Sequence, residues 1–236
     1  MIHPFDAYER IYVINLPSRS DRRLEMAEQL QRIGLVLGSP QVRLFEAVRP
    51  ADAGGFPNRG ARGCFMSHLG VLREAAADRL ARVLVLEDDC NFSDDFLERA
   101  PAALARATSA ECAIFYGGYE QGPEPSSTAA TVELPPDRPV RTTHFVGFDA
   151  TAAAAAVPYL EAILRRPPGD PQGGPMHVDG AYSWLRRAHP ELRTWAADPP
   201  LGYQRASRTD IHALSWFDRT PLVRDAVAVI RRARNR

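Results

Sequence analysis

The chain has 236 residues and a mass of 26.1 kDa, which favours a single α/β domain with long loops. Its 29 basic and 29 acidic residues cancel, so bulk charge gives no reason to expect nucleic acid as a partner. All 29 basic residues are arginine. The absence of lysine excludes P-loop, protein-kinase and Schiff-base chemistry, each of which needs a lysine amine.

The three cysteines, Cys64, Cys90 and Cys112, are odd in number and form no CxxC pair. They predict neither a disulfide framework nor a zinc knuckle, and this cysteine usage fits a reducing cytoplasm. The amino terminus lacks a basic segment followed by an apolar one, so we expect no signal peptide. The longest run of small apolar residues ends at Pro158, far short of a membrane span.

Predicted strands and helices alternate in the first half of the chain. In chain order, the patterns predict a strand at Arg10–Leu16, a helix at Ser20–Ile33, a strand at Val42–Val48, a loop at Arg49–Arg62, a helix at Gly63–Asp78 and a strand at Arg82–Leu86. The last of these strands is continuously apolar, as expected of a central parallel strand that is buried on both faces.

The second half continues the alternation, with two long loops. The patterns predict a helix at Phe92–Ala107, a strand at Cys112–Tyr116, a loop at Tyr119–Pro139 that holds at most one short strand, a strand at Arg141–Phe148, a helix at Ala150–Arg165, a loop at Arg166–Pro175, a helix at His177–Ala188 and a strand at Leu192–Ala196. We therefore predict one doubly wound, mostly parallel sheet over residues 1–220. The pattern of residues 221–236 predicts a basic helix or tail. This segment would either pack on the domain or rest on anionic lipid.

Three consecutive acids, Glu87, Asp88 and Asp89, follow the apolar strand directly. This edge of an open α/β sheet is where ligands bind. Because side chains alternate along a strand, we expect Glu87 and Asp89 to share a face and Asp88 to oppose them. Paired carboxylates suit Mg²⁺ or Mn²⁺. The alternative is a solvated acidic turn that caps the next helix.

Several blocks together resemble glycosyltransferase family 25, which includes lipooligosaccharide and collagen galactosyltransferases. The blocks, in family order, are Tyr12–Pro17 with Asp21–Arg23, Gly63–His68, Leu86–Asp89, Val178–Asp179, and Pro200–Gln204 with Asp210–Ile211. The chain departs from the family pattern at Ala61, where a Glu is usual, and at Thr209, where a Ser is usual. The resemblance implies a single Rossmann-like GT-A domain, a DxD-like metal motif, and inverting transfer, usually from UDP-galactose.

Most of the expected site residues are expected to bind the sugar-nucleotide donor or its metal. With the resemblance in hand, we expect Asp89 to bind Mn²⁺ or Mg²⁺, with Glu87 binding directly or through water, because a divalent cation neutralises the leaving diphosphate. Asp88 is expected at a ribose hydroxyl. The residues expected near the donor are Asn15, Leu16, Arg19, Arg22, Ser67 and His68. For the arginines, including Arg23, the alternative is a solvated helix face.

Helical spacing puts Cys64, Ser67, His68, Val71 and Ala75 on one face, which we expect to be buried. His68 is then interpreted as a hydrogen-bonded inner histidine that shapes the donor pocket, rather than as an acid or base. Ser67 is interpreted in the same way.

Inverting transfer needs a base opposite the leaving group, and Asp179 is the candidate. Its alternative role is a helix N-cap. Asp149 or Asp210 would replace it as base. His212 is a candidate third metal ligand, with an exposed tail histidine as the alternative.

The sequence therefore predicts a metal-dependent inverting glycosyltransferase. It would move a hexose, with galactose as the first candidate, from a UDP-sugar to a hydroxyl of a bacterial glycan or glycolipid such as lipooligosaccharide. The expected location is the cytoplasm or the inner face of the membrane, which the C-terminal segment would contact. Two alternatives stay open: a sugar-phosphate nucleotidyltransferase, and a non-catalytic module that binds a sugar nucleotide or glycan.

Overall fold

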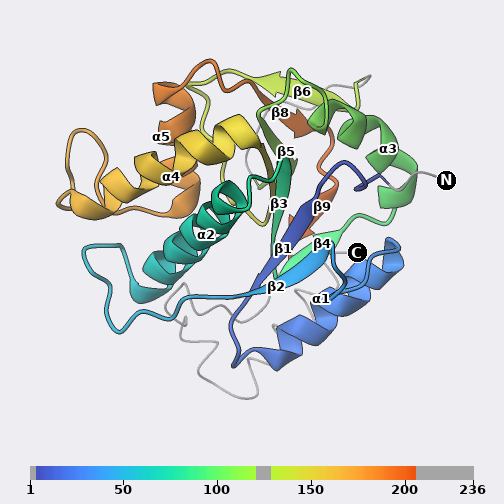
Figure 1. The fold of residues 1–236 in the computed structure, drawn as a ribbon, viewed down its shortest axis with the longest axis horizontal. Coiled ribbons are helices and arrows are strands. Elements are labelled where there is room, and N and C mark those ends of the chain that lie inside the picture. Colours follow the sequence, from blue (N-terminus) through green and yellow to red (C-terminus); the bar gives the residue numbers. More distant parts are fainter. Residues whose placement is uncertain (1–3, 121–128, 206–236) are drawn as a thin grey trace, which may run out of the picture.

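A central sheet lies between two helical layers (Figure 1), with α2, α4 and α5 on one face and α1 and α3 on the other. The computed structural model describes residues 4–120 and 129–205. The helices are α1 (Ser20–Arg32), α2 (Arg59–Ala77), α3 (Phe96–Ala107), α4 (Ala150–Arg165) and α5 (Val178–Ala188). The strands are β1 (Arg10–Asn15), β2 (Val42–Glu46), β3 (Arg82–Glu87), β4 (Cys90–Phe92), β5 (Ile114–Gly118), β6 (Thr131–Leu134), β7 (Phe145–Asp149), β8 (Thr194–Ala197) and β9 (Gly202–Gln204).

The main path of the sheet runs β2-β1-β3-β7-β5-β8-β6, with β9 pairing to β4 and β5 beside it. Strands β2, β1 and β3 are parallel neighbours, and β5 is parallel to β8. Strand β7 is antiparallel to both β3 and β5, and β6 is antiparallel to β8. Two strands of the main path are therefore reversed, and the mostly parallel α/β sheet predicted from the sequence is confirmed.

Alternating side chains of the central strands feed two separate cores. In β3, Val83 and Val85 join the core under α2, α4 and α5, whereas Leu84 and Leu86 join the core under α1 and α3. All four are at most 1% exposed. Each such buried side chain stabilises the fold by roughly 1.5–3 kcal/mol relative to an exposed one. This burial on both faces explains why the strand is continuously apolar.

Two expected helix starts are wrong, and two short strands were not expected. Helix α2 begins at Arg59 rather than Gly63, because the Asn58 side chain caps it by accepting a hydrogen bond from Ala61 N at 2.8 Å. The helix expected from Phe92 begins at Phe96, because residues 90–92 instead form β4. Strand β9, which pairs with β4, was not predicted.

The described helices include none that is long and apolar enough to cross a membrane. The three thiols are free, with Cys64 half-buried and Cys90 and Cys112 buried. Residues 206–236, which contain the predicted C-terminal segment, lie outside the described residues.

Candidate active site

The carboxyl ends of β1 and β3 lie side by side, because these two strands run parallel. Asn15 is the last residue of β1 and Glu87 the last of β3. Asp88 and Asp89 form the turn that follows. The acidic residues therefore stand at the edge of the sheet where the sequence predicted them and where open α/β sheets bind their ligands.

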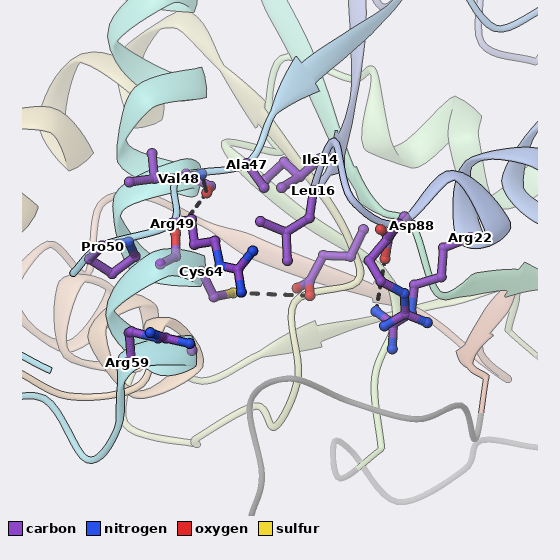
Figure 2. Close-up of a pocket in the computed structure, with 15 residues that line it drawn as sticks. Ile14, Leu16, Arg22, Ala47, Val48, Arg49, Pro50, Arg59, Cys64 and Asp88 are labelled. Atoms are coloured by element: carbon purple, nitrogen blue, oxygen red, sulfur yellow. Dashed lines mark hydrogen bonds and ion pairs between the residues drawn. The ribbon is translucent and has the colours of Figure 1, made fainter. Parts of the chain in front are cut away.

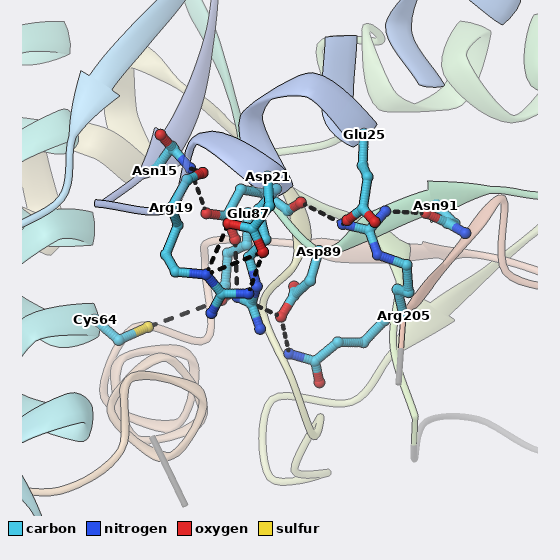
Figure 3. A network of polar contacts seen from close by, with 12 residues as sticks. Asn15, Arg19, Asp21, Glu25, Cys64, Glu87, Asp89, Asn91 and Arg205 are labelled. Atoms are coloured by element: carbon cyan, nitrogen blue, oxygen red, sulfur yellow. Dashed lines mark hydrogen bonds and ion pairs between the residues drawn. The ribbon is translucent and has the colours of Figure 1, made fainter. Parts of the chain in front are cut away.

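The expected division of the three acids between two faces is wrong. Strand β3 ends at Glu87, so the strand alternation does not extend to the two aspartates. Arg22 of α1 donates from Nη1 to Asp88 Oδ1 at 2.9 Å and lies 3.3 Å from Asp89 Oδ2. Figure 2 shows Arg22 beside Asp88, and Figure 3 shows Asp89 in the wider network of polar contacts. Asp88 and Asp89 thus converge on one guanidinium, and Glu87 makes separate contacts.

Burial makes both aspartates reluctant to ionise. Asp88 and Asp89 are 6% and 5% exposed, so the turn is not the solvated cap considered as the alternative. Burial raises the pKa of Asp88, and it raises the pKa of Asp89 to about 7, an effect that the charge of Glu87 reinforces and that of Arg22 opposes. Asp89 Oδ1 is buried and has no hydrogen-bond partner among the described residues.

Strand β9 and the residue after it form hydrogen bonds with the acidic turn. Gln204 donates from Nε2 to Asp89 Oδ2 at 3.2 Å, and Arg205 N donates to the Asp89 carbonyl oxygen at 2.7 Å. The Arg205 guanidinium also pairs with Glu25 of α1 at 2.7 Å (Figure 3). Reasoning from residue patterns missed these contacts, and the one signal for them was the resemblance across Pro200–Gln204.

Glu87 contacts α2 and the segment before β7. Thr143 donates from Oγ1 to Glu87 Oε1 at 2.8 Å, and His68 Nε2 lies 3.4 Å from the same oxygen. Burial alone would raise the pKa of Glu87, but the hydrogen bonds and charge of His68, together with Thr143, lower it overall. The other ring nitrogen of His68, Nδ1, lies 3.1 Å from the Tyr182 hydroxyl oxygen. His68 is fully buried, as expected of an inner histidine.

Ser67 holds the loop after β2 against α2. Its Oγ accepts a hydrogen bond from Val48 N at 2.8 Å and donates to the Gly63 carbonyl oxygen at 2.7 Å. A Cβ at Gly63 would come within 2.5 Å of the Val48 carbonyl oxygen. The glycine of this block is therefore required by a close backbone approach, and Ser67 shapes the wall of the neighbouring cavity.

Two cavities meet at this edge of the sheet. The first has a volume of about 170 Å³ and is lined on the α1 side by Arg22 and Asp88 and on the α2 side by Arg49 and Arg59 (Figure 2). The second, of about 220 Å³, is lined by residues before β7 and at the start of α5. Cys64 and Glu87 line both cavities.

The arginines of the first cavity fall into two groups. Arg19 pairs with Asp21 at 2.9 Å, and Arg22 is held by the two aspartates. In contrast, the exposed side chains of Arg49 and Arg59 make no hydrogen bond or ion pair with the described residues, although both line the cavity. The sequence reasoning missed them because the loop before α2 has no periodic pattern.

Asn15 and Leu16, which were expected near the donor, also lie at this edge of the sheet. Asn15 is buried and donates from Nδ2 to Asp88 Oδ2 at 2.7 Å, so it orients that carboxylate. Leu16 lines the first cavity, together with Ser67. His68 does not line it and acts on it only through Glu87.

Asp179 lines the second cavity, near the start of α5. Its carboxylate accepts hydrogen bonds from Gly180 N at 2.7 Å and Thr142 N at 3.2 Å. The N-cap of α5 is His177, so the alternative role of Asp179 as N-cap is wrong.

The two reserve candidates for the base have different outcomes. Asp149 caps α4 through Ala152 N and lies opposite Arg82 in the β3–β7 register, at the other end of β3 from Glu87, which removes it from the site. Asp210 lies outside the described residues, as does His212.

The family comparison covers part of the site, namely α2 and the acidic turn. The model of glycosyltransferase family 25, described as an LPS biosynthesis protein family, matches residues 58–124. This segment runs from the cap of α2 through the acidic turn. The resemblance to glycosyltransferase family 25 is confirmed.

Individual proteins agree with the family match. The human inactive glycosyltransferase 25 family member 3 is 30% identical over 136 residues, which cover 50% of this chain and 23% of that protein. Mouse procollagen galactosyltransferase 2 is 31% identical over 105 residues, covering 38% of this chain and 17% of that protein. The match thus spans less than a quarter of either relative.

A solved structure supports the single GT-A-like domain. A glycosyltransferase involved in glycosylation of the major capsid of PBCV-1 superposes with a TM-score of 0.50 at 11% identity. The superposition covers 85% of this chain and 93% of that one. The family match and the curated relatives support a glycosyltransferase, although the relative named inactive means that activity does not follow from similarity alone.

The metal that the GT-A fold implies has a chemically suitable set of donors here. Divalent Mn²⁺ and Mg²⁺ prefer carboxylate oxygens, and three consecutive acidic residues end β3 and form the turn after it. Asp89 Oδ1 is buried without a hydrogen-bond partner among the described residues. A buried carboxylate oxygen normally has a partner. The unmatched oxygen therefore fits a cation bound at Asp89.

Proposed function

We propose that this chain is a metal-dependent inverting glycosyltransferase that moves a hexose, with galactose as first candidate, from a UDP-sugar to a glycan hydroxyl. One observation carries the proposal: a buried carboxylate with an unmatched oxygen lies in an acidic turn whose Glu87 lines two adjoining cavities. Two substrates need two adjoining binding sites, and a diphosphate leaving group needs positive charge between them. The galactosyltransferase among the relatives supports the choice of sugar.

The first cavity is the proposed donor site. Asp89 and Glu87 would hold Mn²⁺ or Mg²⁺, with His212 as a proposed third ligand, and the bound cation would act as a Lewis acid on the diphosphate. Asp88, which Asn15 and Arg22 fix in place, would accept a hydrogen bond from a ribose hydroxyl.

Arginines would complete the donor site. Arg49 and Arg59 have no competing partner among the described residues and line the same cavity as Arg19. We propose that Arg49 and Arg59 bind the diphosphate, since a guanidinium forms strong charge-assisted hydrogen bonds with phosphate oxygens. Arg22 is already shared by two carboxylates and would act mainly by orienting them.

The second cavity is the proposed acceptor site. Asp179 would take the proton of the acceptor hydroxyl as that oxygen attacks the anomeric carbon and UDP leaves from the other side. Two backbone N–H groups fix the orientation of the Asp179 carboxylate. Thr143 and His68 hold Glu87 between the donor and acceptor sites.

The acceptor class follows the family description. We propose a bacterial glycan or glycolipid such as lipooligosaccharide, met at the cytoplasmic face of the membrane, because the matching family model is described by LPS biosynthesis. The apolar residues within 221–230 and the arginines within 231–236 suit contact with anionic lipid. The second candidate function is a non-catalytic module that binds a sugar nucleotide, which the inactive human relative favours.

A donor screen with one variant tests the proposal. We expect the wild-type protein to release UDP from UDP-galactose only when Mn²⁺ or Mg²⁺ is added. Asp89→Asn should lose metal-dependent UDP-sugar binding and keep its melting temperature within a few degrees, whereas Asp94→Asn at an exposed position should behave as wild type.

The outcomes separate the candidates. Tight UDP-sugar binding without UDP release, across a panel of acceptors, would favour the non-catalytic module. If Asp89→Asn binds UDP-sugar in Mn²⁺ as tightly as wild type, the acidic turn is structural and the proposed metal site is wrong.

A further inference from the structure

We propose that Cys64, His68 and Glu87 form a binding site for Zn²⁺ at the junction of the two cavities. Their ligand atoms, one from each side chain, all lie within 4.8 Å of one another. This proposal rests on these contacts alone and does not depend on the proposed transferase activity. It assigns Cys64 and His68 a ligand role that the donor site does not use.

Helix and strand geometry bring the three ligands together. Cys64 and His68 are four residues apart on α2 and therefore lie on one face of the helix, and Glu87 ends the neighbouring β3. Glu87 Oε2 lies 4.0 Å from Cys64 Sγ, and Glu87 Oε1 lies 3.4 Å from His68 Nε2. In tetrahedral zinc sites with bonds of about 2.0–2.3 Å, ligand atoms are about 3.3–3.8 Å apart. Small side-chain movements would bring the three ligand atoms to the spacing found in zinc sites.

Neighbouring side chains already orient two of the ligands. The Tyr182 hydroxyl lies 3.1 Å from His68 Nδ1, which leaves Nε2 directed at Glu87 and the cavity side. Thr143 donates to Glu87 Oε1 and restrains that carboxylate. Metal-binding histidines and carboxylates characteristically have such partners on their far side. His68 and Tyr182 are both fully buried.

Charge at the site favours a cation over a free thiolate. The carboxylates of Glu87, Asp89 and Asp179 act electrostatically on Cys64 and make its surroundings negative. The same negative surroundings attract a divalent cation, and binding would release the Cys64 proton to solvent as the sulfur–metal bond forms.

The mixed ligand set selects the metal. Thiolate and imidazole favour Zn²⁺ over Mg²⁺ and Mn²⁺, which prefer oxygen ligands. Cys64 and Glu87 line both cavities, so an ion can enter from either side and keep one position open for water. Zn²⁺ bound here would engage Glu87, and we expect it to compete with any use of Glu87 by a donor-bound cation.

Cobalt spectroscopy tests the site without reference to activity. Co²⁺ added to the reduced 236-residue chain should give thiolate-to-cobalt charge-transfer absorption in the near ultraviolet. Zn²⁺ should abolish this absorption by displacement, whereas excess Mg²⁺ should not. Cys64→Ser should remove it, and Cys112→Ser, which changes a buried thiol elsewhere, should retain it.

Two further variants sharpen the test. Tyr182→Phe keeps the ring and removes the hydroxyl beside His68, so Co²⁺ affinity should fall by about 10–100-fold with the absorption band retained. Asp89→Asn should keep the band, which separates this site from the proposed donor-site metal. The proposal is overturned if the folded wild-type protein gives no charge-transfer band, or if Cys64→Ser keeps it.

Discussion

The surroundings of Asp89 in the folded protein disfavour the ionised form of its carboxyl group. Asp89 is 5% exposed, shares Arg22 with Asp88, and has a pKa raised to about 7 by burial. A carboxyl group in this state opposes folding whenever it ionises, because the unfolded chain carries it in water. Binding sites commonly keep such destabilising groups because the ligand needs them. This destabilisation of the fold is consistent with a bound cation that would pair with the Asp89 carboxylate.

Asp179 gives a direct test of the proposed base. Because it contacts the second cavity and not the first, Asp179→Asn should keep the wild-type affinity for UDP-sugar. Transfer should fall by about 10²–10⁴-fold, the usual effect of removing a general base. Donor affinity by calorimetry and turnover by UDP release check the two expectations on one protein.

The control for Asp179 lies at the opposite edge of the sheet. Asp149→Ala removes a helix cap and should lower stability by about 1 kcal/mol with turnover preserved. Normal transfer by Asp179→Asn would remove that residue from the mechanism.

Arg59 tests the diphosphate contact. Arg59→Ala should weaken UDP binding by about tenfold, equivalent to about 1.4 kcal/mol, and leave uridine binding unchanged. The same substitution at Arg43, on exposed β2 and away from the first cavity, should change neither affinity. Equal losses for UDP and uridine would show that Arg59 shapes the loop and does not bind phosphate.

At the scale of elements, α2 connects the loop after β2 with the acidic turn. Its buried face was predictable, because Ser67, His68, Val71 and Ala75 follow helical spacing and are all buried. Its start was not predictable, because Asn58 caps a first turn of Arg and Gly residues that has no apolar periodicity. The arginine that this early start carries into the cavity was missed for the same reason.

Strands β4 and β9 show where local patterns fail. Each has three residues, and they form strands because they pair with one another from positions more than 100 residues apart. No short window of sequence contains both partners. Gln204 and Arg205, which reach the acidic turn from β9, were therefore beyond residue-pattern reasoning.

The buried side chain of His144 should make the stability of the fold depend on pH. It precedes β7, is fully buried, and joins β9 through Gly202 O, 3.3 Å from Nε2. Burial lowers the pKa of His144 below 6.5, so below that pH the unfolded chain takes up a proton that the folded chain resists. Stability should therefore fall as the pH drops below 6.5 and be unaffected by this group above it.

The matched measurement uses two glutamine variants. His144→Gln should lose part of the acid-dependent fall in denaturant midpoint between pH 6.5 and pH 5. His189→Gln, at a half-exposed position, should retain it. Identical pH profiles for wild type and His144→Gln would contradict the assignment.

At the scale of the whole molecule, the alternation of apolar strands and amphipathic helices predicted the layered α/β fold. The apolar run before Glu87 identified a strand buried on both faces and, with it, the edge of the sheet that bears the site. The reversal of β7 was not predictable, because connection lengths do not fix strand direction. Nor was the pairing of Arg22 with both aspartates, which depends on how α1 lies over the turn.

Glu87 lines both cavities, and this shared wall has a thermodynamic consequence. If a donor analogue moves or neutralises Glu87, the affinity of the neighbouring cavity for an acceptor must change by some factor. Linkage then requires the acceptor to change donor affinity by the same factor. Titrating UDP in the presence and absence of a saturating acceptor, and the acceptor with and without UDP, should give two equal ratios different from one. Ratios of one would mean that the two cavities are occupied independently and in any order.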